Sequence, residues 1–383
     1  MALHFSREEF ELRHTRALKA MAARGLDALL MFNQASMYWL TGYDTFGYCF
    51  FQCLVLRAAG DMVLLTRSPD LRQARHTSLI QDIRVWADRE GSDPARDLRD
   101  LLAETGLAGR RLGVEYDTHG LTATNGRRLE AALAGFAEAV DASDLIARLR
   151  LVKSEAELAY VRKAAGLADA ALDAAIAETR AGADEGAILA AMHAAIFRGG
   201  GDYPGNPFII ASGRDALLVR YKSGRRRLDE RDQLTLEFAG VYRQYHACLM
   251  HTLLVGEATP RQRTMHAACR DALAAAEERL KPGSTMGEVY AAQADVFDAR
   301  GMRPHRLNAC GYSLGAVYAP SWMDWPMFYE GNPVEIAPGM VFFLHMILMD
   351  SEAGLAMTLA RTSLVTEHGA EPLSRAPLDL VVT

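Results

Sequence analysis

The chain has 383 residues, of which 50% are apolar and 23% charged, and its formal net charge is −6. The length predicts two domains, and the acidic balance argues against nucleic acid as a partner. No apolar run reaches the ~18 residues of a membrane span, and the first residues lack the basic and apolar regions of a signal peptide. Because five cysteines without CxxC spacing also fit a reducing compartment, we expect a cytoplasmic protein without a membrane partner.

The first 150 residues alternate between helical and strand patterns. Ser6 and Glu9 match a capping box, and apolar residues at helical spacing follow up to Gly25. Strands are then predicted at 28–32, 50–57, 61–65 and 111–115, and further helices at 94–104 and 126–133. This alternation predicts an α/β domain over residues 1–150.

A second domain is predicted over residues 151–383. Ser154 and Glu157 form a capping box ahead of an Ala-rich helix that runs to about Thr179. Further helices are predicted at 185–197, from Pro260 and from Ser284 to about residue 300, and strands at 208–211, 233–238, 247–255 and 340–349. The two halves of this domain therefore share a helix–helix–strand–strand order.

Several short phrases of the second domain occur in the order typical of one superfamily. They are Val152-Lys153-Ser154 with Glu157, Leu236-Glu237-Phe238-Ala239-Gly240, Tyr245-His246, Cys310-Gly311-Tyr312-Ser313-Leu314-Gly315, Pro338-Gly339-Met340-Val341-Phe342 and Leu364-Val365-Thr366. With them the chain resembles the creatinase/prolidase/methionine-aminopeptidase superfamily over essentially its whole length. The resemblance implies a fold of class α/β (α+β), in which a creatinase-like N-terminal domain over 1–150 precedes a pita-bread catalytic domain over 151–383.

The same resemblance implies a homodimer in which an aromatic stretch of the first domain, 43–51, reaches the site of the neighbouring subunit. Tyr43 then becomes a candidate substrate-binding residue. Without the resemblance, this stretch is simply an aromatic turn.

The metallopeptidases of this superfamily hold two metal ions with two Asp, one His and two Glu. The matching positions in this sequence are Glu237, Cys248, Tyr312, His345 and Ala360. One carboxylate, one thiol, one phenol and one imidazole do not balance two divalent cations. A Glu/Cys/His trio could hold one zinc ion by ligand type, but Arg220 nearby in the alignment would oppose a metal cation. The sequence therefore predicts neither a metal nor another cofactor.

Creatinase is the metal-free member for comparison, and its catalytic residues are also replaced. Its catalytic His position matches Arg220, and its two catalytic Glu positions match Met250 and Ala360. The ectoine hydrolase branch is more similar, because it shares a Glu at position 237 and the Gly311-Tyr312 pair, although a His at position 220 and a late carboxylate are expected there.

Three candidate catalytic residues follow from the inward-facing positions. Glu237 interrupts an apolar strand, and a buried carboxylate is either paired or chemically active. It could act as a general base or as a nucleophile. His345 could supply acid–base chemistry near neutral pH, and Tyr312 could donate a hydrogen bond to a developing oxyanion.

The candidate substrate-binding residues are Arg220, His246, His251, Asp324, Trp322 and Tyr43. Arg220 offers a planar fork to a substrate carboxylate, with a plain surface arginine as the alternative. The two histidines lie in apolar strands and could equally be satisfied core residues. The aromatic segment 322–329 carries one acid, as the wall of a small-molecule pocket does, but it could also be a packed loop.

The sequence thus predicts a metal-independent hydrolase that cleaves a C–N bond in a small zwitterionic or cyclic nitrogen compound, similar to ectoine or creatine. Two alternatives remain, because fold does not determine function. One is a peptidase resembling the Xaa-Pro dipeptidases, and the other is a paralogue that binds a small molecule without catalysis. Retention of Glu237 favours catalysis, whereas the loss of the creatinase residues favours binding.

Overall fold

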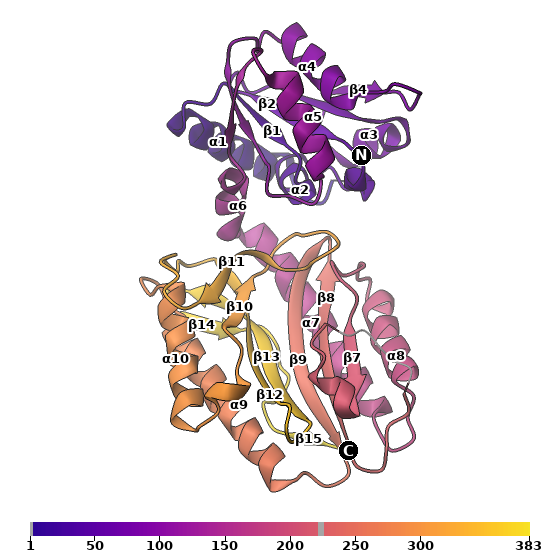
Figure 1. Ribbon diagram of the computed structural model, residues 1–383, viewed down its shortest axis with the longest axis vertical. Coiled ribbons are helices and arrows are strands. Elements are labelled where there is room, and N and C mark those ends of the chain that lie inside the picture. Colours follow the sequence, from indigo (N-terminus) through magenta and orange to yellow (C-terminus); the bar gives the residue numbers. More distant parts are fainter. Residues whose placement is uncertain (1–2, 221–225) are drawn as a thin grey trace. The chain divides into compact units, whose positions relative to one another are not determined.

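The computed structural model describes residues 3–220 and 226–383 and divides into two compact units, Met1–Arg150 and Leu151–Thr383 (Figure 1). Each unit has its own sheet and its own hydrophobic core. Over the described residues, no helix combines the length and the apolar character that crossing a membrane requires.

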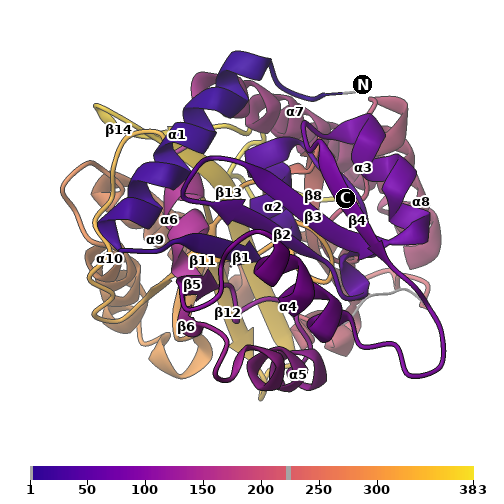
Figure 2. The same cartoon turned by 90° about the horizontal axis from the view of Figure 1, so that it is seen from above.

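The first unit is a mixed sheet of six strands in the order β4-β3-β2-β1-β5-β6. The strands are β1 (Ala28–Met31), β2 (Cys53–Arg57), β3 (Met62–Arg67), β4 (Asp82–Trp86), β5 (Arg111–Val114) and β6 (Glu138–Asp141). The helices are α1 (Arg7–Ala23), α2 (Gln34–Thr41), α3 (Leu71–Thr77), α4 (Pro94–Glu104), α5 (Ala123–Leu133) and α6 (Asp144–Leu151). Figure 2 shows α1 on one side of these strands and α4 with α5 on the other.

Both faces of this first sheet are buried, which explains why its central strand is apolar throughout. Alternate residues of β1 enter different cores: Leu30 packs with α4 and α5, whereas Leu29 packs with α1, α2 and α6. Side chains of a strand alternate between faces, so a strand with both faces covered reads as a continuous apolar run. The α/β architecture expected from the sequence is confirmed.

The second unit is built on a mostly antiparallel sheet of nine strands. Seven of them follow the order β11-β10-β12-β13-β9-β8-β7, and β14 lies beside β13 and β15 beside β9. The strands are β7 (Ile209–Ser212), β8 (Asp232–Tyr242), β9 (Tyr245–Val255), β10 (Ala309–Ser313), β11 (Asp324–Tyr329), β12 (Val341–Asp350), β13 (Leu355–Thr366), β14 (Gly369–Pro372) and β15 (Val381–Val382). The helices are α7 (Glu155–Glu178), α8 (Glu185–Arg198), α9 (Pro260–Arg279) and α10 (Met286–Ala299). This order of elements confirms the expected pita-bread class.

The helices of the second unit pack on one face of its sheet. Phe342 and Leu344 of β12 join the core formed with α9 and α10, so that face of β12 is covered. On β8, Gly240 approaches α7 so closely that a Cβ atom there would lie 2.0 Å from the carbonyl oxygen of Ala164. Successive side chains of a strand point to opposite faces, so the residues that alternate with these along β8 and β12, among them Glu237 and His345, point to the other face.

Local capping signals explain most of the helix starts. Ser154 forms the predicted capping box with Glu157, and Thr259, the residue before the predicted start at Pro260, forms one with Gln262. The start expected at Ser284 is wrong by one residue, because Thr285 caps α10 and bonds with Glu288. The sequence interpretation also missed short elements, which carry few residues for a periodic pattern: α2, α3, α6, β4, β6, β10, β11, β14 and β15.

Candidate active site

Five side chains at the former metal positions lie on one face of the second sheet. Glu237 is paired with Met250, which is paired with Ala360, which is paired with His345. Cross-strand partners share a face, so this row runs from β8 through β9 and β13 to β12. Cys248 on β9 and Tyr312 on β10 have the register of the same face.

Glu237 and Tyr312 meet across this face although three strands separate β8 from β10. In a flat sheet the two strands would be about 19 Å apart, because neighbouring strands are spaced by about 4.8 Å. The Tyr312 hydroxyl nevertheless donates to Glu237 Oε1 over 3.4 Å, and it accepts a bond of 2.8 Å from Trp322 Nε1. The sheet is therefore curved, and these side chains close over its concave face.

Glu237 is buried, with only 9% of its surface exposed. Burial raises its pKa to about 7, while the charge of Arg220 and the hydrogen bond from Tyr312 act in the opposite direction. The carboxyl group is therefore divided between its acid and its ionised form near neutral pH. A carboxylate in this state can accept a proton or attack an electrophilic carbon.

Arg220 is exposed and immediately precedes residues 221–225, which are outside the described chain. Its positive charge acts on three buried groups: it lowers the pKa of Glu237, opposes the rise of the pKa that burial gives Tyr312, and adds to the fall that burial gives His345. The guanidinium of Arg220 is therefore close enough for its charge to act on the buried cluster.

His345 faces the same cluster. Its ring centroid is 5.7 Å from that of Tyr312. Burial lowers its pKa to about 4, so the imidazole is neutral at pH 7. In the described part of the chain, the buried Nδ1 atom of His345 has no side-chain hydrogen-bond partner.

The two other candidate histidines have different surroundings. His246 lies on the face of Glu237, but the backbone N–H of Gly205 donates to its Nε2 and its Nδ1 bonds with the carbonyl of Gln244, both at 2.8 Å. His251 is paired with Leu236, the residue before Glu237, so its side chain lies on the opposite face of the sheet from Glu237. It points toward His266 of α9. The expectation that His251 meets a substrate is therefore corrected: it is a core residue on the helix side.

Two more candidates have other neighbours in the structure. Tyr43 is fully buried in the first unit, and its hydroxyl donates to Gln52 Oε1 at 3.0 Å. It is a core residue, so we correct its assignment as a substrate contact. Asp324 lies beside Gly315, where the Lys153 side chain also approaches, and it accepts from the backbone N–H of Trp325.

The donor set does not fit a two-metal centre. Burial raises the pKa of Cys248 and of Tyr312 well above their usual values, which opposes the anionic forms that bind metal ions. Ala360 has no donor atom. Among residues 3–220 and 226–383, no group of three or more His, Cys, Asp or Glu side chains is placed to hold a metal ion.

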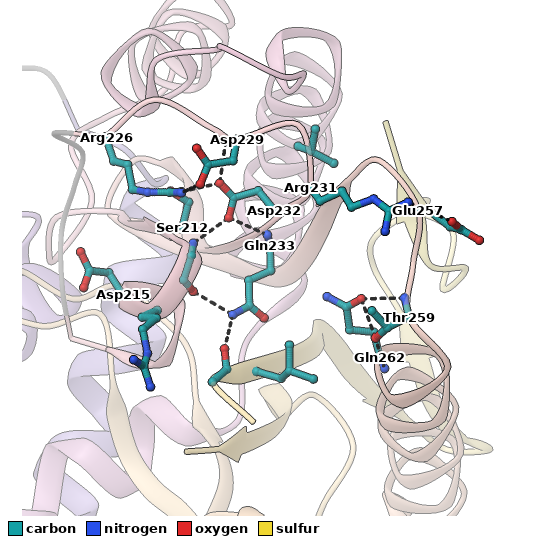
Figure 3. A pocket seen from close by; sticks show the side chains of 15 residues that line it. Ser212, Asp215, Arg226, Asp229, Arg231, Asp232, Gln233, Glu257, Thr259 and Gln262 are labelled. Carbon is teal, nitrogen blue, oxygen red and sulfur yellow. Dashed lines mark hydrogen bonds and ion pairs between the residues drawn. The ribbon is translucent and has the colours of Figure 1, made fainter. Parts of the chain in front are cut away.

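A pocket of about 530 Å³ lies elsewhere, where β7 ends and β8 begins (Figure 3). Its buried polar groups already bond to the protein. Asp232 accepts from the Gly213 N–H and from the Arg226 guanidinium, and the Gln233 amide donates to the carbonyls of Gly213 and Gly354 at 2.7 Å each. These bonds join the ends of neighbouring segments, so the groups stabilise the fold instead of awaiting a ligand.

Sequence reasoning missed Asn206 and Gly205, which support the cluster from a loop before β7. The Asn206 side chain accepts from the Trp322 N–H at 3.1 Å. A Cβ atom at Gly205 would lie 2.8 Å from the Ser321 carbonyl. Nothing in the local pattern points to these residues, because the two loops are over a hundred positions apart in the chain.

An α/β unit followed by a curved antiparallel sheet, with helices on one face and a polar cluster on the other, defines the class of two-domain pita-bread hydrolases. Residues 13–152 match the Creatinase/Prolidase N-terminal domain, and residues 159–367 match Metallopeptidase family M24. The chain belongs to metallopeptidase family M24, and it is a hydrolase of that family.

Named relatives span this chain to different extents. The ectoine hydrolase of Halomonas elongata is 28% identical over 400 aligned positions, which cover 100% of this chain and 99% of that protein. The Xaa-Pro dipeptidase of Pyrococcus furiosus is 25% identical and covers 62% of this chain. The solved prolidase of Thermococcus sibiricus shares the fold with a TM-score of 0.88 at 17% identity, over 99% of this chain and 100% of that one.

The free energy of unfolding should depend on pH in a way that reflects the burial of Glu237. Its folded pKa of about 7 lies above the ordinary value, so folding favours the protonated form. The stability gained in this way is present at low pH and is lost as the pH rises through 7. We expect Glu237→Gln to differ little from the parent near about pH 5 and to be more stable by about 3 kcal/mol near about pH 9. Urea unfolding of both proteins across this range measures the difference, and a difference independent of pH would contradict the raised pKa.

Proposed function

We propose that this protein is a metal-independent hydrolase that cleaves a C–N bond in a small zwitterionic or cyclic nitrogen compound. The observation that carries the proposal is the buried Glu237 carboxyl group. Burial raises its pKa to about 7, and the Tyr312 hydroxyl and the Arg220 charge both stabilise its ionised form. The relationship to ectoine hydrolase over the full length supports this class of substrate.

The proposed chemistry depends on Glu237. Its ionised form removes a proton from water or attacks the carbon of the scissile C–N bond directly. Arg220 holds a substrate carboxylate, because its planar fork matches two oxygens, it is exposed and its charge acts on Glu237. Tyr312 and the neutral His345 stabilise the charge that develops on the reacting group.

A peptidase activity is the second candidate, and the similarity to Xaa-Pro dipeptidases favours it. The donor set argues against the two-metal version of that reaction, as described above. A third candidate, binding without catalysis, is favoured by the absence of a carboxylate at positions 250 and 360.

A substrate screen separates the three candidates. The panel comprises cyclic amidines, ureides, N-acyl diamino acids and Xaa-Pro dipeptides, each tested for turnover and for binding. We expect turnover of a carboxylate-bearing cyclic or acylated amine, with a KM that rises in Arg220→Ala by about tenfold or more. Turnover confined to Xaa-Pro dipeptides would favour the peptidase, and saturable binding without turnover of any compound would favour the binding protein.

Metal content provides an independent test of the proposal. Because one carboxylate remains among the five former ligand positions, we expect no stoichiometric zinc, manganese or iron after mild purification. Elemental analysis measures this directly. One or more equivalents of metal, together with activity that chelators abolish, would overturn the metal-independent mechanism.

We also propose a homodimer, in which the aromatic stretch of the first unit forms the contact. Phe46 and Phe50 of this stretch are 80% and 47% exposed, whereas Tyr43 is buried. Exposed aromatic side chains are typical of the anchors of protein interfaces. Light scattering should give twice the 42.0 kDa of one chain. A monomer at micromolar concentration would contradict the proposal.

A further inference from the structure

The bond between Trp322 and Tyr312 determines where the tyrosine proton points. The indole N–H is only a donor, so at 2.8 Å the Tyr312 oxygen must accept from it. The phenol has a single proton of its own. Its other neighbour, Glu237 Oε1 at 3.4 Å, accepts hydrogen bonds when ionised. With the Trp322 N–H donating to one lone pair of the oxygen, the hydroxyl proton is directed away from the indole, and Glu237 Oε1 is the acceptor that it meets.

Trp322 is held by a loop that belongs to a distant part of the chain. Its backbone N–H donates to Asn206 Oδ1 at 3.1 Å. Gly205, the preceding residue, packs directly on the backbone of Ser321 and Trp322, where a Cβ atom would approach within 2.8 Å. This contact leaves no room for a side chain at position 205. The loop that contains Gly205 therefore packs against the Ser321–Trp322 backbone at a fixed point.

His246 anchors that loop to the sheet. The Gly205 N–H donates to Nε2, so Nε2 carries the lone pair and the proton resides on Nδ1, which donates to the Gln244 carbonyl. Gln244 lies in the β8–β9 turn and has a positive φ of 69°. Both ring nitrogens are therefore used, and the imidazole joins the turn to the loop that supports Trp322.

We propose that Trp322 and His246 are positioning residues that orient the Tyr312 hydroxyl toward Glu237, with Asn206 and Gly205 as the link between them. They act through Tyr312 and not on the substrate. The proposal rests on the proposed function insofar as Glu237 is the reacting group, but the orientation itself is measurable without any substrate.

The decisive experiment measures the titration of Glu237. The free energy of unfolding is compared between proteins with Glu and with Gln at position 237 across pH, and the upper end of the pH range in which that difference changes gives the titration midpoint of the carboxyl group in the folded protein. Trp322→Phe removes the N–H and keeps a ring. It should raise the midpoint by about 0.5–1 pH unit, because the hydroxyl is no longer fixed as a donor to the carboxylate.

Three comparisons make the result specific. Trp39→Phe is the matched control, since the Trp39 N–H is buried without a partner in the described chain, and its midpoint should not move. In a Tyr312→Phe background, Trp322→Phe should have no further effect on the midpoint, since the hydroxyl through which it acts is gone. His246→Phe removes both imidazole bonds and should shift the midpoint in the same direction by a smaller amount.

An unchanged midpoint in Trp322→Phe would overturn the proposal, and so would an equal shift in the Tyr312→Phe background. Either result stands whether or not a substrate is found, so it is distinct from a failure of the hydrolase assignment. If turnover is detected, Trp322→Phe should also move the rising limb of the pH profile upward while KM stays within about twofold. An altered KM with an unmoved pH profile would mean that Trp322 contacts substrate instead.

Discussion

Glu237→Gln should lower kcat/KM by about 10²–10⁴-fold on any substrate that the protein hydrolyses. The amide occupies nearly the same volume but neither accepts a proton near neutral pH nor attacks carbon. The wild-type rate should rise with pH through about 7, because burial raises the Glu237 pKa to that value and the ionised form is the active one. The variant should lose this rise.

A matched control exists in the first unit. Glu115 is also buried and its pKa is also raised to about 7 by burial, but its carboxylate accepts from the backbone N–H groups of Phe32 and Asn33 at the start of α2. Glu115→Gln should alter stability and leave kcat/KM within about twofold. If Glu237→Gln also retained its rate, another group would have to be the base or nucleophile, and the proposed mechanism would be wrong.

Gly311→Ala should destabilise the protein by about 2–4 kcal/mol and reduce activity as well. Gly311 adopts a φ of 151°, and a Cβ atom there would lie 2.2 Å from the Phe343 carbonyl oxygen of β12. The backbone would have to move at the residue immediately before Tyr312. The displaced hydroxyl would then lie farther from Glu237, which should reduce turnover beyond the fraction of unfolded protein.

Gly166→Ala is the corresponding control. Gly166 lies within α7, is exposed, and a Cβ atom there would meet no atom within 4 Å. Alanine in an exposed helix interior should stabilise by up to about 1 kcal/mol, with unchanged activity. Urea unfolding and a rate measurement at low temperature separate the two effects. A Gly311→Ala protein as stable as the parent would show that β10 and β12 tolerate a wider separation.

Part of this structure could be predicted because its causes are local. Ser154 with Glu157, and Thr259 with Gln262, lie three residues apart, so each box is visible in the sequence before any tertiary contact exists. The alternation of helices and strands likewise indicated the fold class. The ordered superfamily phrases identified the family, and its metal positions showed which residue types replace the ligands.

The placement of side chains around Glu237 could be decided only by the tertiary structure. Tyr312 reaches Glu237 because the sheet is curved across three intervening strands, and curvature arises from the packing of whole layers. Whether a strand histidine meets the cluster depends on a register of period two, so His251 and Met250, adjacent in sequence, face opposite sides.

His246 illustrates the same limit in another way. Its strand position was visible in the sequence, but its hydrogen-bonding capacity is used by Gly205, a residue from a loop that comes before β7. The fold class, the family and the identity of the one carboxylate left at the metal positions all followed from residue patterns along the chain. Which polar atoms remain open to a ligand, and which are already satisfied, was decided by contacts between distant segments that form only when the chain is folded.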